Sequence, residues 1–184
     1  RSAIESLPRV NDPDLRAQLT DIAAHDVRRI DRLVTDISEA SRVDAEISRA
    51  VLERFDLAEL VRNIAGLREN RAENAGHLIA LDLPPVPVRV MGVPARLERV
   101  IENLIDNAVS FSPQDAPIEV RLAEQGADII LSVSDHGPGI PEDKREQVFE
   151  RFHSLRPDAE DFGNHSGLGL AIARTIAEAH DGTL

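Results

Sequence analysis

Residues 97–112 read LERVIENLIDNAVSFS, and this stretch decides the fold that we expect for the rest of the chain. Apolar side chains recur along it at steps of three and four residues, which is the spacing of one buried face of an α-helix. They are Leu97, Val100, Ile101, Leu104, Ile105 and Ala108. Asn103 and Asn107 lie four residues apart and share a helical face that is offset from this stripe. Two such amides suit a hard cation and phosphate oxygens, although a solvated helix face also tolerates asparagine.

The composition restricts the kinds of ligand that the protein can bind. A chain of 184 residues with 42% hydrophobic content forms one large or two small domains and can bury a core. It contains no cysteine, which excludes disulfides, thiolate metal sites and cysteine nucleophiles. The formal net charge of −12 argues against general electrostatic binding of nucleic acid or anionic lipid. An anionic ligand therefore requires a local device, such as backbone N–H groups or a metal ion.

The first 50 residues predict a helical hairpin. Residues 1–7 are typical of the end of a first helix, and Asp12 and Pro13 are typical of the start of a second. Apolar residues then keep helical spacing over residues 15–46, and a stripe of this length needs other helices against it. We expect the hairpin to pair with a second copy into a four-helix bundle. The alternative is a lone helix packed on the following domain.

Residues 51–184 predict an α+β domain, because the pattern changes near residue 50 from one long stripe to short elements. Asp56 is placed to cap a helix that begins at Leu57, and Pro94 to open the helix described above. We expect one sheet and one layer of helices. The predicted strands are residues 54–55, 77–83, 88–91, 118–123 and 129–134, the last two joined as a hairpin, and a final helix spans residues 171–180.

Two glycine clusters follow the hairpin. Asp135 ends a strand and runs into Gly137 and Gly139, where its carboxylate can accept a hydrogen bond from an amino group such as that of adenine. Further on, residues 166–170 (SGLGL) lead into a helix, whose N-terminus offers free N–H groups and a positive dipole to phosphates. Residues 153–165 between them are polar and without periodicity, which predicts a mobile loop or lid. Each cluster alone fits an ordinary turn, but their order and spacing together favour a nucleotide site.

Four motifs in this order resemble those of the cytoplasmic part of sensor histidine kinases. ENLIDNA (102–108) resembles the N box of that family, DHGPGI (135–140) its first glycine box, FERF (149–152) its F box and SGLGL (166–170) its second glycine box. Residues 26–45 also resemble the second helix of the family's dimerisation domain. The resemblance implies a dimeric helical hairpin over residues 1–50, with its first helix truncated. It also implies an ATP-binding α/β sandwich of the GHKL (Bergerat) type over residues 51–184, with its C-terminal strands truncated.

The resemblance implies a role for each residue of the ATP site. Asn103 and Asn107 would flank the phosphates, with Asn107 as the Mg²⁺ ligand. Asp135 would read adenine, Phe111 would stack on or border the base, and the two glycines of the first box would shape the pocket. The family often carries a basic residue at the position of Ser110, so Arg151 or His165 would supply that phosphate contact here. The implied ATP-binding set is Asn103, Asn107, Phe111, Asp135, Gly137, Gly139, Arg151, His165, Gly167, Leu168 and Gly169.

The phosphoacceptor motif of the family is absent from the sequence. His25 lies in the predicted second helix and lacks the proline that follows the family's acceptor, so we do not expect it to be phosphorylated. The acceptor histidine would lie upstream of Arg1.

The resemblance implies an ATP- and Mg²⁺-dependent histidine kinase of a two-component system. Its partners would be a second copy and a response regulator, and it would bind no nucleic acid. The chain would be the cytoplasmic portion of a bacterial inner-membrane sensor, attached to the membrane only through upstream segments. The alternatives are another ATPase or serine kinase of the same fold, and a dimeric ATP-binding module without its own chemistry.

Overall fold

The computed structural model describes residues 51–75, 77–153 and 167–184, together with six positions between residues 15 and 27. Those six positions are helical, as the periodicity of that region predicts. The remainder of the predicted hairpin and His25 lie outside the described residues. No helix among the described residues is long and apolar enough to cross a membrane.

Strand β1 (Glu53–Asp56) leads directly into helix α3 (Leu57–Ala75), and Asp56 caps the helix as predicted. The Asp56 carboxylate oxygen Oδ1 accepts hydrogen bonds from the backbone N–H of Ala58 and from that of Val88, each at 3.0 Å. Val88 precedes strand β3 (Arg89–Gly92), which pairs antiparallel with β1. One carboxylate therefore fixes both the start of α3 and the approach to β3.

The Asp56 cap makes the stability of the domain depend on pH. Partial desolvation acts to raise the pKa of the Asp56 carboxyl, but the N–H donors of Val88, Glu59 and Ala58 and the charge of Arg89 outweigh it. The pKa is therefore lowered on folding, so the stabilisation is present above the unfolded-state pKa and is lost as pH falls through the folded-state pKa.

We expect Asp56→Ala to lower the melting temperature at pH 7 by several degrees, because the helix loses its cap. The gap between the melting temperatures of variant and wild type should narrow as pH falls below about 4, because the Asp56 carboxyl of the unfolded chain takes up a proton there while that of the folded chain does so only at lower pH. Thermal unfolding followed by circular dichroism from pH 7 to pH 3 measures it. A gap that stays constant over this range would contradict the role of the charged cap.

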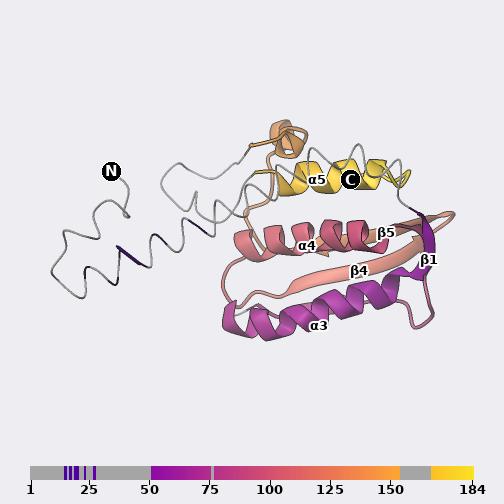
Figure 1. Ribbon diagram of the computed structural model, residues 1–184, viewed down its shortest axis with the longest axis horizontal. Coiled ribbons are helices and arrows are strands. Elements are labelled where there is room, and N and C mark those ends of the chain that lie inside the picture. The colour runs from indigo at the N-terminus through magenta and orange to yellow at the C-terminus, as the bar shows by residue number, and fades with distance from the viewer. Residues whose placement is uncertain are drawn as a thin grey trace.

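Helix α4 (Pro94–Phe111) begins at the predicted proline and has two packing partners. Ile101 and Ile105 are fully buried against α3 and the sheet, whereas Val100 packs with Leu97 and Leu104 against the C-terminal helix α5 (Gly169–Glu178). The single apolar stripe of the sequence is thus divided between two clusters of buried side chains. Helix α4 lies between α3 and α5 (Figure 1).

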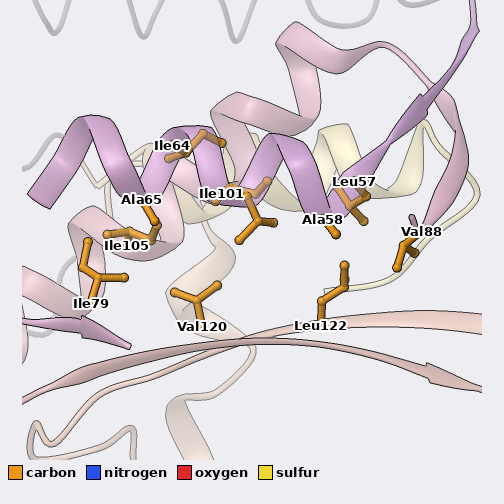
Figure 2. Close-up of a cluster of buried hydrophobic side chains, with 11 residues drawn as sticks. Leu57, Ala58, Ile64, Ala65, Ile79, Val88, Ile101, Ile105, Val120 and Leu122 are labelled. Carbon is orange, nitrogen blue, oxygen red and sulfur yellow. The ribbon is translucent and has the colours of Figure 1, made fainter. Parts of the chain in front are cut away.

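A three-stranded sheet supports these helices. It consists of β2 (Ile79–Asp82), β4 (Ile118–Gln125) and β5 (Asp128–Ser134) in the order β2-β4-β5. Strands β4 and β5 form the predicted antiparallel hairpin, whereas β2 runs parallel to β4 with Ile79 opposite Ile118. Alternate side chains of β4, including Val120 and Leu122, are buried and point toward the helices (Figure 2).

The prediction of one sheet is wrong for the described strands, which form two separate ladders. Strands β1 and β3 pair only with each other, apart from the β2-β4-β5 sheet. The connection from β2 to β3 contains Pro84, Pro85 and Pro87, which lack the N–H that a ladder requires. Strand β2 of the three-stranded sheet therefore ends at these prolines, and the chain then forms β3, which pairs with β1.

Two short 3₁₀ helices, η2 (Glu142–Lys144) and η3 (Gln147–Phe149), follow the sheet, and then α5 closes the fold. Helix α5 begins two residues before the predicted start and ends before His180. The backbone N–H of Val93 donates to Nε2 of His180 at 3.1 Å, so Nδ1 carries the proton and donates to the carbonyl of Ile176 at 2.7 Å. This imidazole ties the end of α5 to the start of α4.

Candidate functional site

The N box and the second glycine box meet through one side chain. Asn103 projects from α4, and its Nδ2 amide group donates a hydrogen bond to the carbonyl of Gly169 at 3.1 Å. Gly169 is the first residue of α5, where helical N–H groups lack intrahelical partners. Asn107 lies one turn further along α4 and is half-buried. The two asparagines predicted from the sequence therefore lie on a helix that contacts the N-terminus of α5.

The first glycine box forms a tight turn against the C-terminal end of α4. The Asp135 carboxylate oxygen Oδ1 accepts from the backbone N–H of Gly137 at 2.6 Å. A Cβ atom at Gly137 would lie 2.8 Å from the carbonyl oxygen of Phe111, so only glycine fits there. This approach brings Asp135, Gly137 and Phe111 together. Gly139 has a φ of +72° and faces open space.

Two residues that sequence reasoning missed fasten this turn. The backbone N–H of His136 donates to Ser112 Oγ at 3.3 Å, and the Nδ1 atom of His136 lies 3.1 Å from the carbonyl oxygen of Pro117. Ser112 is the C-cap of α4. These bonds join the residues after β5 to the residues after α4, and so they hold Asp135 beside the C-terminal end of that helix. The only sequence signal was a hydroxyl residue at the end of the predicted helix.

The second glycine box is joined to the F box by the backbone. The N–H of Phe152 donates to the carbonyl of Gly167 at 3.0 Å. Gly167 has a φ of +67°, and a Cβ atom there would lie 2.9 Å from the carbonyl oxygen of His153. Phe152 itself has a φ of 65°, a conformation that costs a non-glycine residue roughly 1–3 kcal/mol. Phe152 is 64% exposed, so backbone contacts, and not burial of the residue, hold it in this conformation.

The other predicted site residues differ in where they lie. Leu168 is fully buried in the cluster between α4 and α5, so it can contact a ligand only through its backbone. Arg151 is exposed between Phe149 and Phe152. His165 and most of the predicted lid lie outside the described residues. Among the residues that the structure does describe, no group of three or more His, Asp or Glu side chains is arranged to hold a metal ion.

Comparison with known sequences identifies relatives over the whole chain. The family described as "Histidine kinase-, DNA gyrase B-, and HSP90-like ATPase" matches residues 92–184. The sensor protein ChvG of Rhizobium meliloti is 44% identical over 191 residues, which is 100% of this chain and 33% of ChvG. The probable sensor histidine kinase TcrY of Mycobacterium tuberculosis is 35% identical over 95% of this chain and 36% of its own length. The chain thus spans about a third of the length of these relatives.

Solved structures of histidine kinases resemble the fold of this chain. A mycobacterial sensor histidine kinase, MprB, is 32% identical with a TM-score of 0.60 and covers 71% of this chain and 81% of its own. The catalytic domain of histidine kinase ThkA is 26% identical with a TM-score of 0.62, over 71% of this chain and 82% of that domain. These likenesses confirm the predicted α+β fold of the GHKL type.

Proposed function

Since the chain belongs to the family of histidine kinase-, DNA gyrase B- and HSP90-like ATPases, we propose that it binds Mg-ATP between α4, the Asp135 turn and the N-terminus of α5. The protein to which it belongs would transfer the γ-phosphoryl group to a histidine of a dimerisation hairpin, and from there to a response regulator. Residues 1–50 would supply part of that hairpin and residues 51–184 the ATP-binding domain. The proposal places the chain in the cytoplasmic portion of a membrane-anchored sensor.

The hydrogen bond between Asn103 and Gly169 carries this proposal. It sets the helix that holds Asn107 beside the helix N-terminus that begins at Gly169. A helix N-terminus attracts phosphate groups through its free N–H groups and its dipole. The Asp135 turn packs against the C-terminal end of α4, at Phe111, two turns beyond Asn103. One helix thus spans from a site suited to phosphates to a carboxylate suited to an amino group, which matches the two ends of an adenine nucleotide.

The Asn107 side chain fits a magnesium ion bound together with a nucleotide. Mg²⁺ in such sites takes one or two protein oxygens and completes its octahedron with phosphates and water. The half-buried amide of Asn107 supplies one such oxygen on the helix face that also carries Asn103. The ion would neutralise phosphate charge, and the protein would contribute mainly positioning.

We expect Asn107→Ala to weaken Mg-ATP binding about tenfold, because one oxygen ligand of the ion is lost, a change of about 1.4 kcal/mol. Binding of ATP in the presence of EDTA should change much less. Isothermal titration calorimetry measures both affinities. Asp106→Asn is the matched control, since Asp106 is the neighbouring residue but forms an ion pair with Arg68 of α3. Equal Mg-ATP affinities of Asn107→Ala and wild type would contradict the metal role.

Phosphoryl transfer is tested with a supplied acceptor. The chain is incubated with γ-labelled Mg-ATP and a dimerisation hairpin that carries an acceptor histidine. We expect acid-labile label on the hairpin and none on the chain alone, since the sequence predicts His25 in the second helix of the hairpin and the family's acceptor lies in the first. Release of labelled phosphate without labelled hairpin would favour an ATPase, acid-stable label a serine kinase, and binding without turnover an ATP-binding module.

A further inference from the structure

Arg174 forms a cluster of three contacts on the exposed side of α5. Its Nη1 atom donates to Glu146 Oε2 at 2.9 Å, and its Nε atom donates to Glu178 Oε1 at 3.2 Å. The guanidinium carbon also lies 4.9 Å from the centroid of the Phe149 ring, within the range of a cation–π interaction. The hydrogen bond to Glu146 is the main reason that the pKa of Arg174 is raised above its ordinary value.

These contacts cross between two parts of the chain. Glu178 belongs to the same helix as Arg174, four residues further on. Glu146 and Phe149 belong instead to the segment of 3₁₀ helices, immediately before and at the end of η3. Arg174 therefore connects η3 to α5, and Glu146 and Phe149 are its two anchors on the η3 side.

The same segment is attached to α5 a second time, at the glycine turn. Phe152 follows η3 by three residues, and its N–H donates to the carbonyl of Gly167. Gly167 stands two residues before the start of α5, and its neighbours Phe152 and His153 leave no room for a Cβ atom. The contacts of Arg174, Phe149, Phe152 and Gly167 thus run from α5 to η3 and back to the glycine turn that leads into α5.

We propose that Arg174 is a positioning residue for the glycine turn Gly167–Gly169. By holding η3 against α5, it fixes Phe152, and Phe152 in turn fixes the carbonyl of Gly167 and the direction of the backbone that enters α5. This inference rests on the proposed function, in which the turn meets the phosphates of the nucleotide. Arg174 acts through the turn and does not itself contact the ligand.

The contacts of Arg174 are exposed, which distinguishes a role in positioning the turn from a role in stabilising the whole domain. The side chain of Glu146 is 83% exposed, and exposed ion pairs contribute little to global stability. Loss of the cluster should therefore leave the fold intact and displace the turn. A displaced turn weakens contacts with the β- and γ-phosphates, which AMP lacks, but leaves recognition of the base at Asp135 unchanged.

The test compares the affinities of ATP and AMP, measured by calorimetry in the same buffer. We expect Arg174→Met to lower the preference for ATP over AMP roughly threefold to tenfold, the size of one exposed ion pair plus one cation–π contact. Glu146→Gln should lower it about twofold to threefold for loss of the ion pair alone. Glu178→Gln is the matched control, because it removes a partner of Arg174 that does not reach η3. Arg174→Lys keeps the charge and should restore part of the preference.

Each outcome decides the inference. A preference that is unchanged in Arg174→Met, or equal effects of Glu146→Gln and Glu178→Gln, would overturn it while the proposed ATP site stands. If the preference is unchanged because the affinities for ATP and AMP fall by the same factor, Arg174 has a general structural role. A wild-type chain that binds ATP no better than AMP would instead refute the phosphate role of the turn, and the inference with it.

Discussion

Asp135→Asn should weaken ATP binding roughly 100-fold, the largest effect that we expect from any single substitution in the protein. The Asp135 carboxylate has to accept twice, because Oδ1 already accepts from the N–H of Gly137 at 2.6 Å and adenine offers a further donor in its amino group. An asparagine has only one acceptor oxygen. It either loses the bond to Gly137 and opens the turn, or it directs its own NH₂ group at the adenine NH₂ group.

Inosine triphosphate provides the control for this prediction. Its base carries a carbonyl where adenine carries the amino group, so the NH₂ group that the substitution introduces can donate to it. Relative to wild type, the variant should shift its preference from ATP toward inosine triphosphate in competition calorimetry. Asp128→Asn changes an exposed carboxylate at the start of β5 and should alter neither affinity. An ATP affinity of Asp135→Asn equal to that of wild type would exclude Asp135 as the residue that reads the base.

Gly167→Ala should weaken ATP binding about 30-fold. The left-handed conformation at a φ of +67° costs an alanine about 1–2 kcal/mol. In addition, its Cβ atom would lie 2.9 Å from the carbonyl oxygen of His153 and 3.0 Å from the carbonyl carbon of Phe152, which are both backbone atoms. The turn can relieve these contacts only by breaking the bond between Phe152 and Gly167. That change moves the backbone that leads into α5.

Gly126→Ala is the matched control for Gly167→Ala. Gly126 lies between β4 and β5 with a φ of +68°, so alanine meets the same conformational cost there, but an added Cβ atom has nothing within 4 Å. This variant should keep the ATP affinity of wild type, because Gly126 lies outside the proposed site. Calorimetric titration with Mg-ATP and thermal unfolding measure both variants. Similar ATP affinities for the two alanine variants would mean that the shape of the turn at Gly167 does not matter for binding.

The sequence predicted elements well where the determining interactions are local. The cap at Asp56, the opening of α4 at Pro94 and the β4-β5 hairpin each depend on residues within a few positions of one another. The periodicity of apolar residues predicted that one face of α4 is buried but not which elements pack against it. The stripe of α4 packs on one side against α3 and the sheet and on the other, at Leu97 and Leu104, against α5. Hydrophobic periodicity also could not show that the strands form two separate ladders, because the strands that pair are far apart along the chain.

In the candidate site, too, features that depend on local sequence could be predicted and contacts between distant residues could not. Asn103, Asp135 and the glycines could be proposed from the sequence, because the chemistry of a nucleotide site favours these residue types in this order. The bonds between His136 and Ser112, and between Arg174 and Glu146, join residues more than twenty positions apart and have no local signature. The left-handed backbone of Phe152 was not predictable either, because an aromatic residue disfavours it. The bundle, the lid and the role of His165 stay predictions, since most of those residues lie outside the part of the chain that the structure describes.

The parallel pairing of β2 with β4 bears on how the site comes into existence. Strand β2 and strand β4 are neighbours in the sheet but are separated along the chain by β3 and α4. Pairing them closes a long loop and carries an entropic cost that the β4-β5 hairpin does not. Helix α4 lies inside that loop, so Asn103 and Asn107 take their places only when the loop closes. The capacity to bind a ligand at α4 is therefore a property of the completed fold, and a chain that has formed only the hairpin does not possess it.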